Sequence, residues 1–174
     1  PPPRSPLFPY TTLFRSDVVK GYLARFYFWT RQWDSAIYYA GEVIKNHPLV
    51  DREGYKAMMT NGYSLKGNML IKSELISSSS SEQEGASTYN SLNYRPVSKR
   101  VIDTFSDTEK SNDIRYEMNF SALRIATKFI FSGMRSAEML LIRAESYYHK
   151  GSEDLALADI NTLRGNRILN YEPL

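Results

Sequence analysis

The sequence predicts a mainly α-helical fold in which helical hairpins near the two ends of the chain flank a long, mixed insertion. Two observations predict the hairpins. Apolar residues recur at helical spacing in residues 17–48 and again in 136–168, and the two stretches align at a fixed offset of 120 residues. A third observation predicts the insertion, because residues 49–135 show no sustained periodicity of this kind.

The first hairpin is predicted to begin at Asp17 with an amphipathic stripe at i, i+3, i+4, i+7 and i+8 spacing. A short turn follows at Arg31-Gln32, and Asp34 opens a second helix that ends just before Pro48. The apolar positions of the two helices are Val19, Tyr22, Leu23, Phe26, Tyr27, Ala36, Ile37, Ala40, Val43 and Ile44.

The second hairpin is predicted from Ser136–Tyr148 and Glu153–Arg164, with a turn at Gly151-Ser152. Small residues at matching points let two antiparallel helices approach closely. This is the tetratricopeptide (TPR) pattern, with Pro48 at the closing position, although Lys20 and Arg143 depart from it. The pairs that the offset brings together are Ala24 with Ala144, Tyr27 with Tyr147, Phe28 with Tyr148, Asp34 with Asp154, Ala36 with Ala156 and Val43 with Leu163.

The insertion is predicted to mix loops with short elements. Ser77–Gly85 is typical of a solvated loop, and Gly133 is expected to end a strand before the last hairpin. Because the insertion separates the hairpins along the chain, we do not expect a plain tandem array. The expected elements are a helix over Glu53–Thr60, a strand within Asn68–Ile76, a helix over Arg95–Phe105 and a strand over Leu123–Phe131.

Residues 1–16 lack helical or strand periodicity, and four prolines precede Leu7. Their string PLFPYTTLFRS resembles a translated sequencing adapter, so we predict a non-native or disordered segment and begin the domain at Asp17. A genuine proline-rich linker is the alternative. In both cases we expect the natural start of the protein to lie elsewhere.

Composition excludes several function classes. The formal charge is +3, from 22 Lys and Arg against 19 Asp and Glu, which is too balanced to predict nucleic-acid binding. The absence of cysteine excludes disulfides and thiolate chemistry, and His47 and His149 lack partners at metal-ligand spacing. We therefore expect no metal, no cofactor and no catalytic residues. No apolar run is long enough to span a membrane.

Several segments resemble the SusD/RagB-type proteins. Residues 135–145 read RSAEMLLIRAE and are followed by Tyr147-Tyr148, Gly151, Ala156 and Asn161-x-x-Arg164-x-x-Arg167, similar to the last TPR hairpin of that family. The stretch YRPVS at 94–98, with Asp113-x-Arg115 after it, resembles the family's R-P-S … D-x-R segment. LARFY at 23–27, with Trp33-Asp34-x-Ala36 and Glu42-Val43-Ile44, resembles the preceding hairpin. The resemblance covers roughly residues 17–170.

The resemblance implies a partial SusD-like domain from a lipoprotein on the cell surface, in the outer membrane of Bacteroidetes-type bacteria. Such proteins are not enzymes. They bind glycans, including oligosaccharides, or other nutrients and deliver them to a TonB-dependent (SusC-like) outer-membrane transporter. Their helical pairs form the scaffold and their loops the ligand face. The chain would then be an internal fragment without the lipidation signal, and no ligand residue of the family can be placed on it.

Aromatic side chains are the candidate sugar contacts, because sugars stack on aromatic rings. Tyr63, Tyr89 and Tyr94 lie in loop-like sequence and are the candidate ligand-binding residues. The aromatic residues of 17–60 stand at helix-packing spacing, and most of them are expected in the core. These are Tyr22, Phe26, Tyr27, Phe28, Trp29, Trp33, Tyr38, Tyr39 and Tyr55.

Polar residues of the last hairpin allow another function class. Glu138 and Glu145 lie seven residues apart on one helix face. This spacing suggests the hypothesis of a carbohydrate-active hydrolase that uses two carboxylates. We favour structural ion pairs, because Arg143 lies between them. Asn161, Arg164 and Arg167 are expected to bond nearby carbonyls and loops.

A TPR-type scaffold that binds a peptide or a partner helix is the second alternative, which the long insertion disfavours. In a fragment of a larger helical stack we also expect apolar patches to be exposed along residues 17–46 and 136–164.

Overall fold

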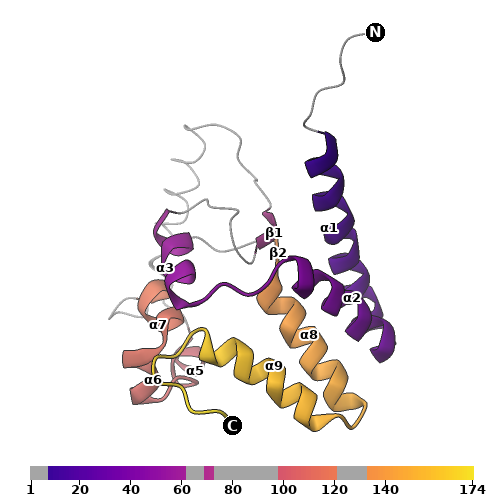
Figure 1. Ribbon diagram of the computed structural model, residues 1–174. Helices are drawn as coiled ribbons and strands as arrows, with labels where there is room; N and C mark the ends of the chain where they lie inside the picture. Colours follow the sequence, from indigo (N-terminus) through magenta and orange to yellow (C-terminus); the bar gives the residue numbers. More distant parts are fainter. Residues whose placement is uncertain (1–7, 62–68, 73–97, 121–132) are drawn as a thin grey trace.

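The computed structural model describes residues 8–61, 69–72, 98–120 and 133–174, and helices dominate it (Figure 1). Its strands, β1 (Met69–Lys72) and β2 (Gly133–Arg135), form an antiparallel pair. The mainly helical class with a short-strand insertion is therefore confirmed. The helices are α1 (Phe8–Trp29), α2 (Trp33–Asn46), α3 (Arg52–Asn61), α5 (Lys99–Ile102), α6 (Asp107–Asn112), α7 (Ile114–Asn119), α8 (Ser136–His149) and α9 (Glu153–Gly165).

The two predicted hairpins, α1–α2 and α8–α9, stack directly on each other because α2 packs against α8 (Figure 1). Ala36 and Ala40 of α2 are completely buried, in one core with Met139 and Ile142 of α8. The insertion therefore leaves the stack after α2 and returns to it at α8. The insertion separates the two hairpins along the chain but not in space.

Positions that the offset of 120 residues relates are buried in both hairpins. The small residues that were predicted to let the helices approach are all buried, and so are the aliphatic residues near the end of each second helix. Each hairpin is thus closed by the same kind of contact. The buried pairs are Ala24 with Ala144, Ala36 with Ala156 and Val43 with Leu163.

The first helix of each hairpin ends in the same turn. In the first hairpin the amide of Gln32 donates to Tyr27 O at 2.8 Å, and in the second the amide of Ser152 donates to Tyr147 O at 2.9 Å. The preceding residue is left-handed in both, with φ of 57° at Arg31 and 74° at Gly151. This is a Schellman ending, in which glycine is the favoured residue.

The tips of the hairpins also touch. The Trp33 and His149 rings stack with their centroids 4.3 Å apart, and Lys150 forms an ion pair with Asp34. Trp33 is half-buried by this contact rather than placed in the core.

Several predicted boundaries were wrong. Helix α1 extends to Phe8, nine residues before the expected start at Asp17. Gly133, which was expected to break a strand, itself lies in β2 and pairs with Lys72. The helix expected from Arg95 to Phe105 is described only as α5, and the strand over Leu123–Phe131 lies outside the described residues.

Helices α6 and α7 were missed because each has only six residues, too few for an amphipathic period to stand out. A local signal was nevertheless present. Ser106 and Glu109 form a capping box, in which Ser106 Oγ accepts from the Glu109 amide at 3.2 Å and Glu109 Oε2 accepts from the Ser106 amide at 2.9 Å.

Half of the expectation for the aromatic residues was wrong. Tyr55 is buried, and Tyr27, Phe28 and Tyr39 pack against the core as predicted. Four others are largely exposed: Tyr22 at 51%, Phe26 at 55%, Trp29 at 81% and Tyr38 at 61%. Leu141, Tyr148, Leu155 and Leu157 are also exposed, so large apolar side chains lie on the surface of both predicted stretches, 17–46 and 136–164.

The two Schellman turns give a matched test. Arg31→Gly is expected to stabilise the chain by about 0.5–1 kcal/mol, because glycine adopts the left-handed conformation without a Cβ clash. Gly151→Ala should destabilise it by a similar amount for the same reason. Urea unfolding of both variants measures the change, and equal effects of one sign would contradict the prediction.

Candidate functional site

The insertion is joined to the end of α9 by a short stretch of paired backbone. The Ile114 amide donates to Arg167 O at 3.0 Å, and the Leu169 amide donates to Asn112 O at 3.0 Å. Asp113 and Ile168 face each other as an antiparallel bridge. The turn between α6 and α7 is therefore held against the chain that follows α9.

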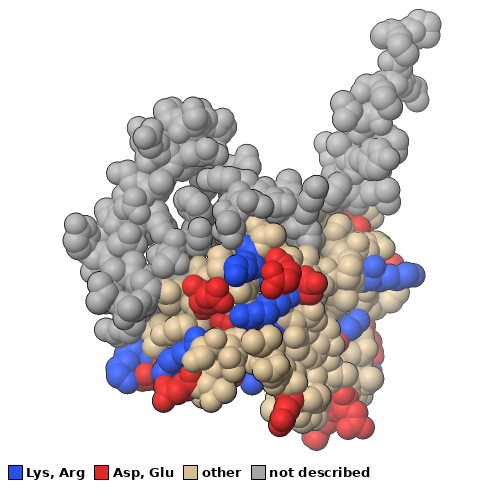
Figure 2. Space-filling model, turned by 60° about the vertical axis from the view of Figure 1, so that its left-hand side comes forward, with Lys and Arg blue, Asp and Glu red and all other residues tan. Residues whose placement is uncertain are grey.

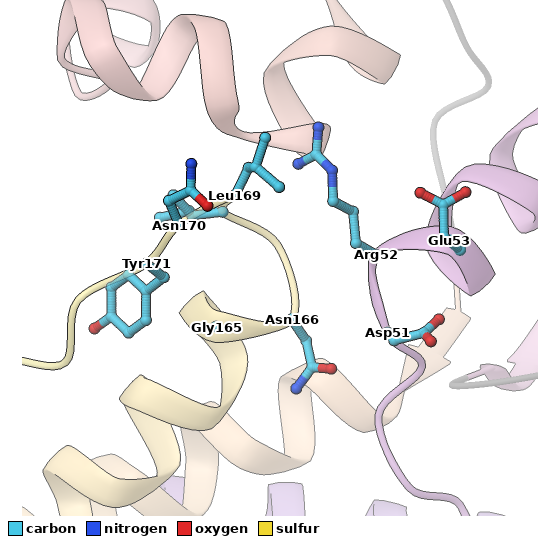
Figure 3. Close-up of a pocket in the computed structure, with 9 residues that line it drawn as sticks. Asp51, Arg52, Glu53, Gly165, Asn166, Leu169, Asn170 and Tyr171 are labelled. Atoms are coloured by element: carbon cyan, nitrogen blue, oxygen red, sulfur yellow. The ribbon is translucent and has the colours of Figure 1, made fainter.

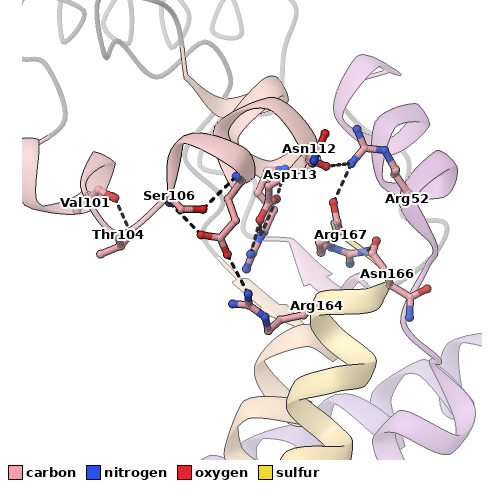
Figure 4. Close-up of polar contacts among 11 residues, drawn as sticks. Arg52, Val101, Thr104, Ser106, Asn112, Asp113, Arg164, Asn166 and Arg167 are labelled. Carbon is pink, nitrogen blue, oxygen red and sulfur yellow. Dashed lines mark hydrogen bonds and ion pairs between the residues drawn. The ribbon is translucent and has the colours of Figure 1, made fainter. Parts of the chain in front are cut away.

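Arg52 connects the start of α3 to the same place. Its Nη1 donates to Asn112 O at 2.6 Å and to Arg167 O at 2.8 Å (Figure 4). Three segments that are far apart in the sequence thus meet here: the start of α3, the turn between α6 and α7, and the end of α9. We call this meeting point the arginine junction, defined by Arg52, Asn112, Asp113 and Arg167.

Arg167 is the most buried cation of the junction, with 1% of its surface exposed. Its Nη1 donates to the carbonyls of Val50 at 2.7 Å and Asn166 at 2.8 Å, and its guanidinium lies 4.6 Å from the centre of the Tyr55 ring. Burial lowers the pKa of Arg167 to about 10, so the side chain still carries its charge at neutral pH. Nη2 is buried without a hydrogen-bond partner.

Ion pairs surround this centre. Asp113, 1% exposed, accepts from the Arg115 amide at 2.8 Å and from Arg115 Nη2 at 2.5 Å. Arg164 Nη2 donates to Glu109 Oε1 at 2.9 Å (Figure 4). The Ser106 amide, with help from Arg164, holds the pKa of Glu109 below its usual range.

The polar residues at the end of the last hairpin act as predicted. Asn161 Oδ1 accepts from the Tyr171 hydroxyl at 2.6 Å and from the Leu174 amide at 3.0 Å. Asn161 therefore holds the segment that follows α9, whereas Arg164 bonds Glu109 of α6 and Arg167 bonds the carbonyls of Val50 and Asn166. Two of the segments that carried the family resemblance, Asp113-x-Arg115 and Asn161-x-x-Arg164-x-x-Arg167, therefore lie where the insertion meets the helical stack.

A shallow pocket lies beside the arginine junction (Figure 3). Its volume is about 360 Å³, and it is wide open to solvent. One wall comes from the start of α3 and the other from the end of α9 and the chain after it. The lining residues are Asp51, Arg52, Glu53, Gly165, Asn166, Ile168, Leu169, Asn170 and Tyr171.

The pocket offers hydrogen-bond acceptors that the protein itself does not use. Among the described residues, the Glu53 and Asn170 side chains have no hydrogen-bond partner. Within the part of the chain that the structure describes, Asp51 accepts at Oδ1 alone, from the Gly54 amide at 2.7 Å, and Asn166 bonds through Nδ2 alone, to Thr162 O at 2.8 Å. A ligand rich in hydroxyl donors matches this arrangement.

Tyr171 gives the pocket a fixed aromatic wall. Asn161 holds its hydroxyl, and the Arg164 guanidinium lies 5.3 Å from its ring centre. The ring lies against Gly165, where an added Cβ would be 3.5 Å away from it, an ordinary van der Waals distance. The wall is therefore in place before any ligand binds.

The two carboxylates of α8 that the sequence singled out have different partners. Glu138 makes a two-pronged contact with Arg25 of α1, at 2.5 and 2.7 Å, and so links the two hairpins. Glu145 is exposed and lies 3.8 Å from His149. The expected pairing with Arg143 was wrong, because Arg143 bonds Asp159 of α9 at 2.6 and 2.7 Å.

The predicted ligand residues Tyr63, Tyr89 and Tyr94 lie outside the described residues. The pocket residues were missed, although the same criterion, an aromatic residue in loop-like sequence, applies to Tyr171. All three predicted ligand residues lie in the insertion, and none lies in the short segment after α9. Only the fold brings that segment to the start of α3.

Over the described ranges, no cluster of three or more His, Asp or Glu residues is arranged to hold a metal ion. No helix in the described part of the chain is long and apolar enough to cross a bilayer. Positive and negative side chains are interspersed on the face in Figure 2, rather than gathered into a patch of one sign. This agrees with the small formal charge of +3.

No protein-family model matches this chain, and no curated protein matches it either. The assignment of a function therefore depends on the residues and on the geometry described above.

The arginine junction predicts a large effect of one buried side chain. Arg167→Ala should lower the free energy of unfolding by about 3 kcal/mol, because two buried carbonyls lose a charged donor. The exposed Arg100→Ala is the control, with an expected change within about 0.5 kcal/mol. Urea unfolding measures both, and equal effects would show that the junction does not stabilise the fold.

Glu109 predicts a dependence of stability on pH. Because its pKa is lower in the folded than in the unfolded chain, its contribution is present above the unfolded pKa and is lost as pH falls through the folded pKa. Glu109→Gln should therefore lose less stability than the wild type between pH 7 and pH 3, measured by urea unfolding. Glu172→Gln, at an exposed position, is expected to follow the wild type.

Proposed function

We propose that this chain belongs to a non-catalytic protein that binds glycans or other nutrients at the cell surface and delivers them to a TonB-dependent outer-membrane transporter. The observation that carries the binding role is the pocket beside the arginine junction, with its unused acceptors and its aromatic wall. The transporter partner and the outer-membrane location come from the SusD/RagB resemblance.

Sugars suit this pocket for two reasons. Their hydroxyl groups donate to carboxylates and amides, which here are Asp51, Glu53, Asn166 and Asn170. Their apolar ring faces pack against aromatic and aliphatic side chains, which here are Tyr171 and Leu169. The pocket lies where the insertion meets the helical stack, so the helices act as the scaffold and the connecting segments as the ligand face.

A catalytic role is disfavoured for the carboxylates considered from the sequence. Glu138 is occupied by Arg25, and Glu145 points to an exposed contact with His149. A glycosidase needs two carboxylates that converge on one substrate bond. We therefore propose that the chain binds its ligand without cleaving it.

Titration calorimetry of the full chain with neutral malto-, cello-, xylo- and mannooligosaccharides tests the proposal. We expect at least one series to bind, with a Kd of about 10 µM or weaker, as a ligand of this size in an open pocket would. Glu53→Gln should weaken that binding about tenfold, since it removes a charged acceptor.

Glu145→Gln is the matched control, because it neutralises an exposed helical glutamate away from the pocket. It should bind as the wild type does. If all four series fail to bind, or both variants weaken binding equally, this pocket is not a glycan site.

A protein-interaction scaffold is the second candidate function. The direct stacking of α2 on α8 favours it, because the insertion no longer argues against a continuous helical surface. In that case a peptide or partner helix, rather than a sugar, would be the ligand.

A further inference from the structure

Among the described residues, one face of α1 is apolar and largely exposed. Val19 is 56% exposed, Tyr22 51%, Phe26 55% and Trp29 81%. We call these four side chains the α1 seam. The opposite side of the same helix is buried, with Ala24 completely covered and α2 packed along it. Helix α1 lies along one edge of the described part of the chain (Figure 1).

The seam has the spacing of a helix that packs against another helix. Its members are separated by three, four and three residues, as in the repeating positions of a coiled coil. This spacing is the same in both directions along the helix, with its centre at the level of residue 24. A face of this kind is suited to a two-fold axis, across which the same surface meets itself.

The side chains also complement one another in size. When two copies of α1 run antiparallel about residue 24, Val19 lies opposite Trp29 and Tyr22 lies opposite Phe26 of the other copy. The smallest member thus meets the largest, and the two rings of intermediate size meet at the centre. Alternation of large and small residues gives even packing, and aromatic pairs add to the attraction.

Charge does not oppose this contact. Lys20 bonds Glu42 at 3.2 Å, and Arg25 bonds Glu138. Asp17 accepts from Asn46 at 3.0 Å and lies 3.0 Å from His47. The charges of α1 between residues 17 and 29 are therefore already paired within the chain, and two seams can approach without like-charge repulsion.

We propose that the α1 seam is a self-association surface, on which a second copy of this chain packs antiparallel about a two-fold axis. Three aromatic rings, each offering about 150–250 Å² when uncovered, give an apolar area on the order of 400 Å² per chain. This is about half of a standard interface, so the dimer is weak and reversible and forms as the concentration rises.

Sedimentation velocity of the full chain, from about 1 µM to about 1 mM, tests the proposal. The expected result is a shift from monomer to dimer over this range, which Phe26→Glu abolishes. Tyr148→Glu is the matched control, since it places the same charge at an aromatic residue of α8 that is 62% exposed. Circular dichroism is the check that both variants remain helical.

Cross-linking tests the orientation. Because the sequence contains no cysteine, each variant below carries a single thiol. Val19→Cys mixed with Trp29→Cys should give mixed disulfide dimers in preference to dimers of either variant alone. A preference for dimers of like variants would indicate parallel packing and overturn the two-fold arrangement. A chain that stays monomeric, or that Tyr148→Glu disrupts as strongly as Phe26→Glu, would overturn the seam as the surface.

Discussion

The close packing of α2 on α8 is the contact on which the rest of the structure depends. Small residues of α2, Ala36 and Ala40, allow α8 to approach, and Met139 and Ile142 fill the space between them. This contact brings the two ends of the insertion together. The Ser136 hydroxyl then donates to His47 O at 2.6 Å, where the chain leaves one hairpin and enters the other. A long insertion is tolerated because closing a loop costs little more as the loop grows.

A second constraint orders the described parts of the insertion. Arg52 and Arg167 both donate from Nη1 to main-chain carbonyls, so they join separate stretches of backbone. Arg52 Nη2 also pairs with Glu117 at 3.4 Å. Charge buried in this way is expensive, which the lowered pKa of Arg167 reflects. Arg52 also lines the pocket, so a residue that joins the elements of the fold also shapes the candidate site.

The two surfaces proposed here differ in chemistry and lie on different elements. The pocket between α3 and the chain after α9 is lined by acceptors and one aromatic ring, as a sugar site requires. The α1 seam is apolar and lies on the first helix of the first hairpin. A ligand at the pocket and a second copy at the seam use separate residues, so each can be tested without disturbing the other.

The sequence by itself determined the helical class, both hairpins and their repeat, because apolar spacing and small residues such as Ala24 and Ala144 are local signals. It also predicted that Asn161, Arg164 and Arg167 bond neighbouring loops. Only the tertiary structure decided which partners they take, that the hairpins stack across the insertion, and that β1 pairs with β2. It also decided that Tyr22, Phe26, Trp29 and Tyr38 remain exposed, since periodicity reveals an apolar face but not what covers it. The pocket is set by contacts between residues more than a hundred positions apart, which no local pattern encodes.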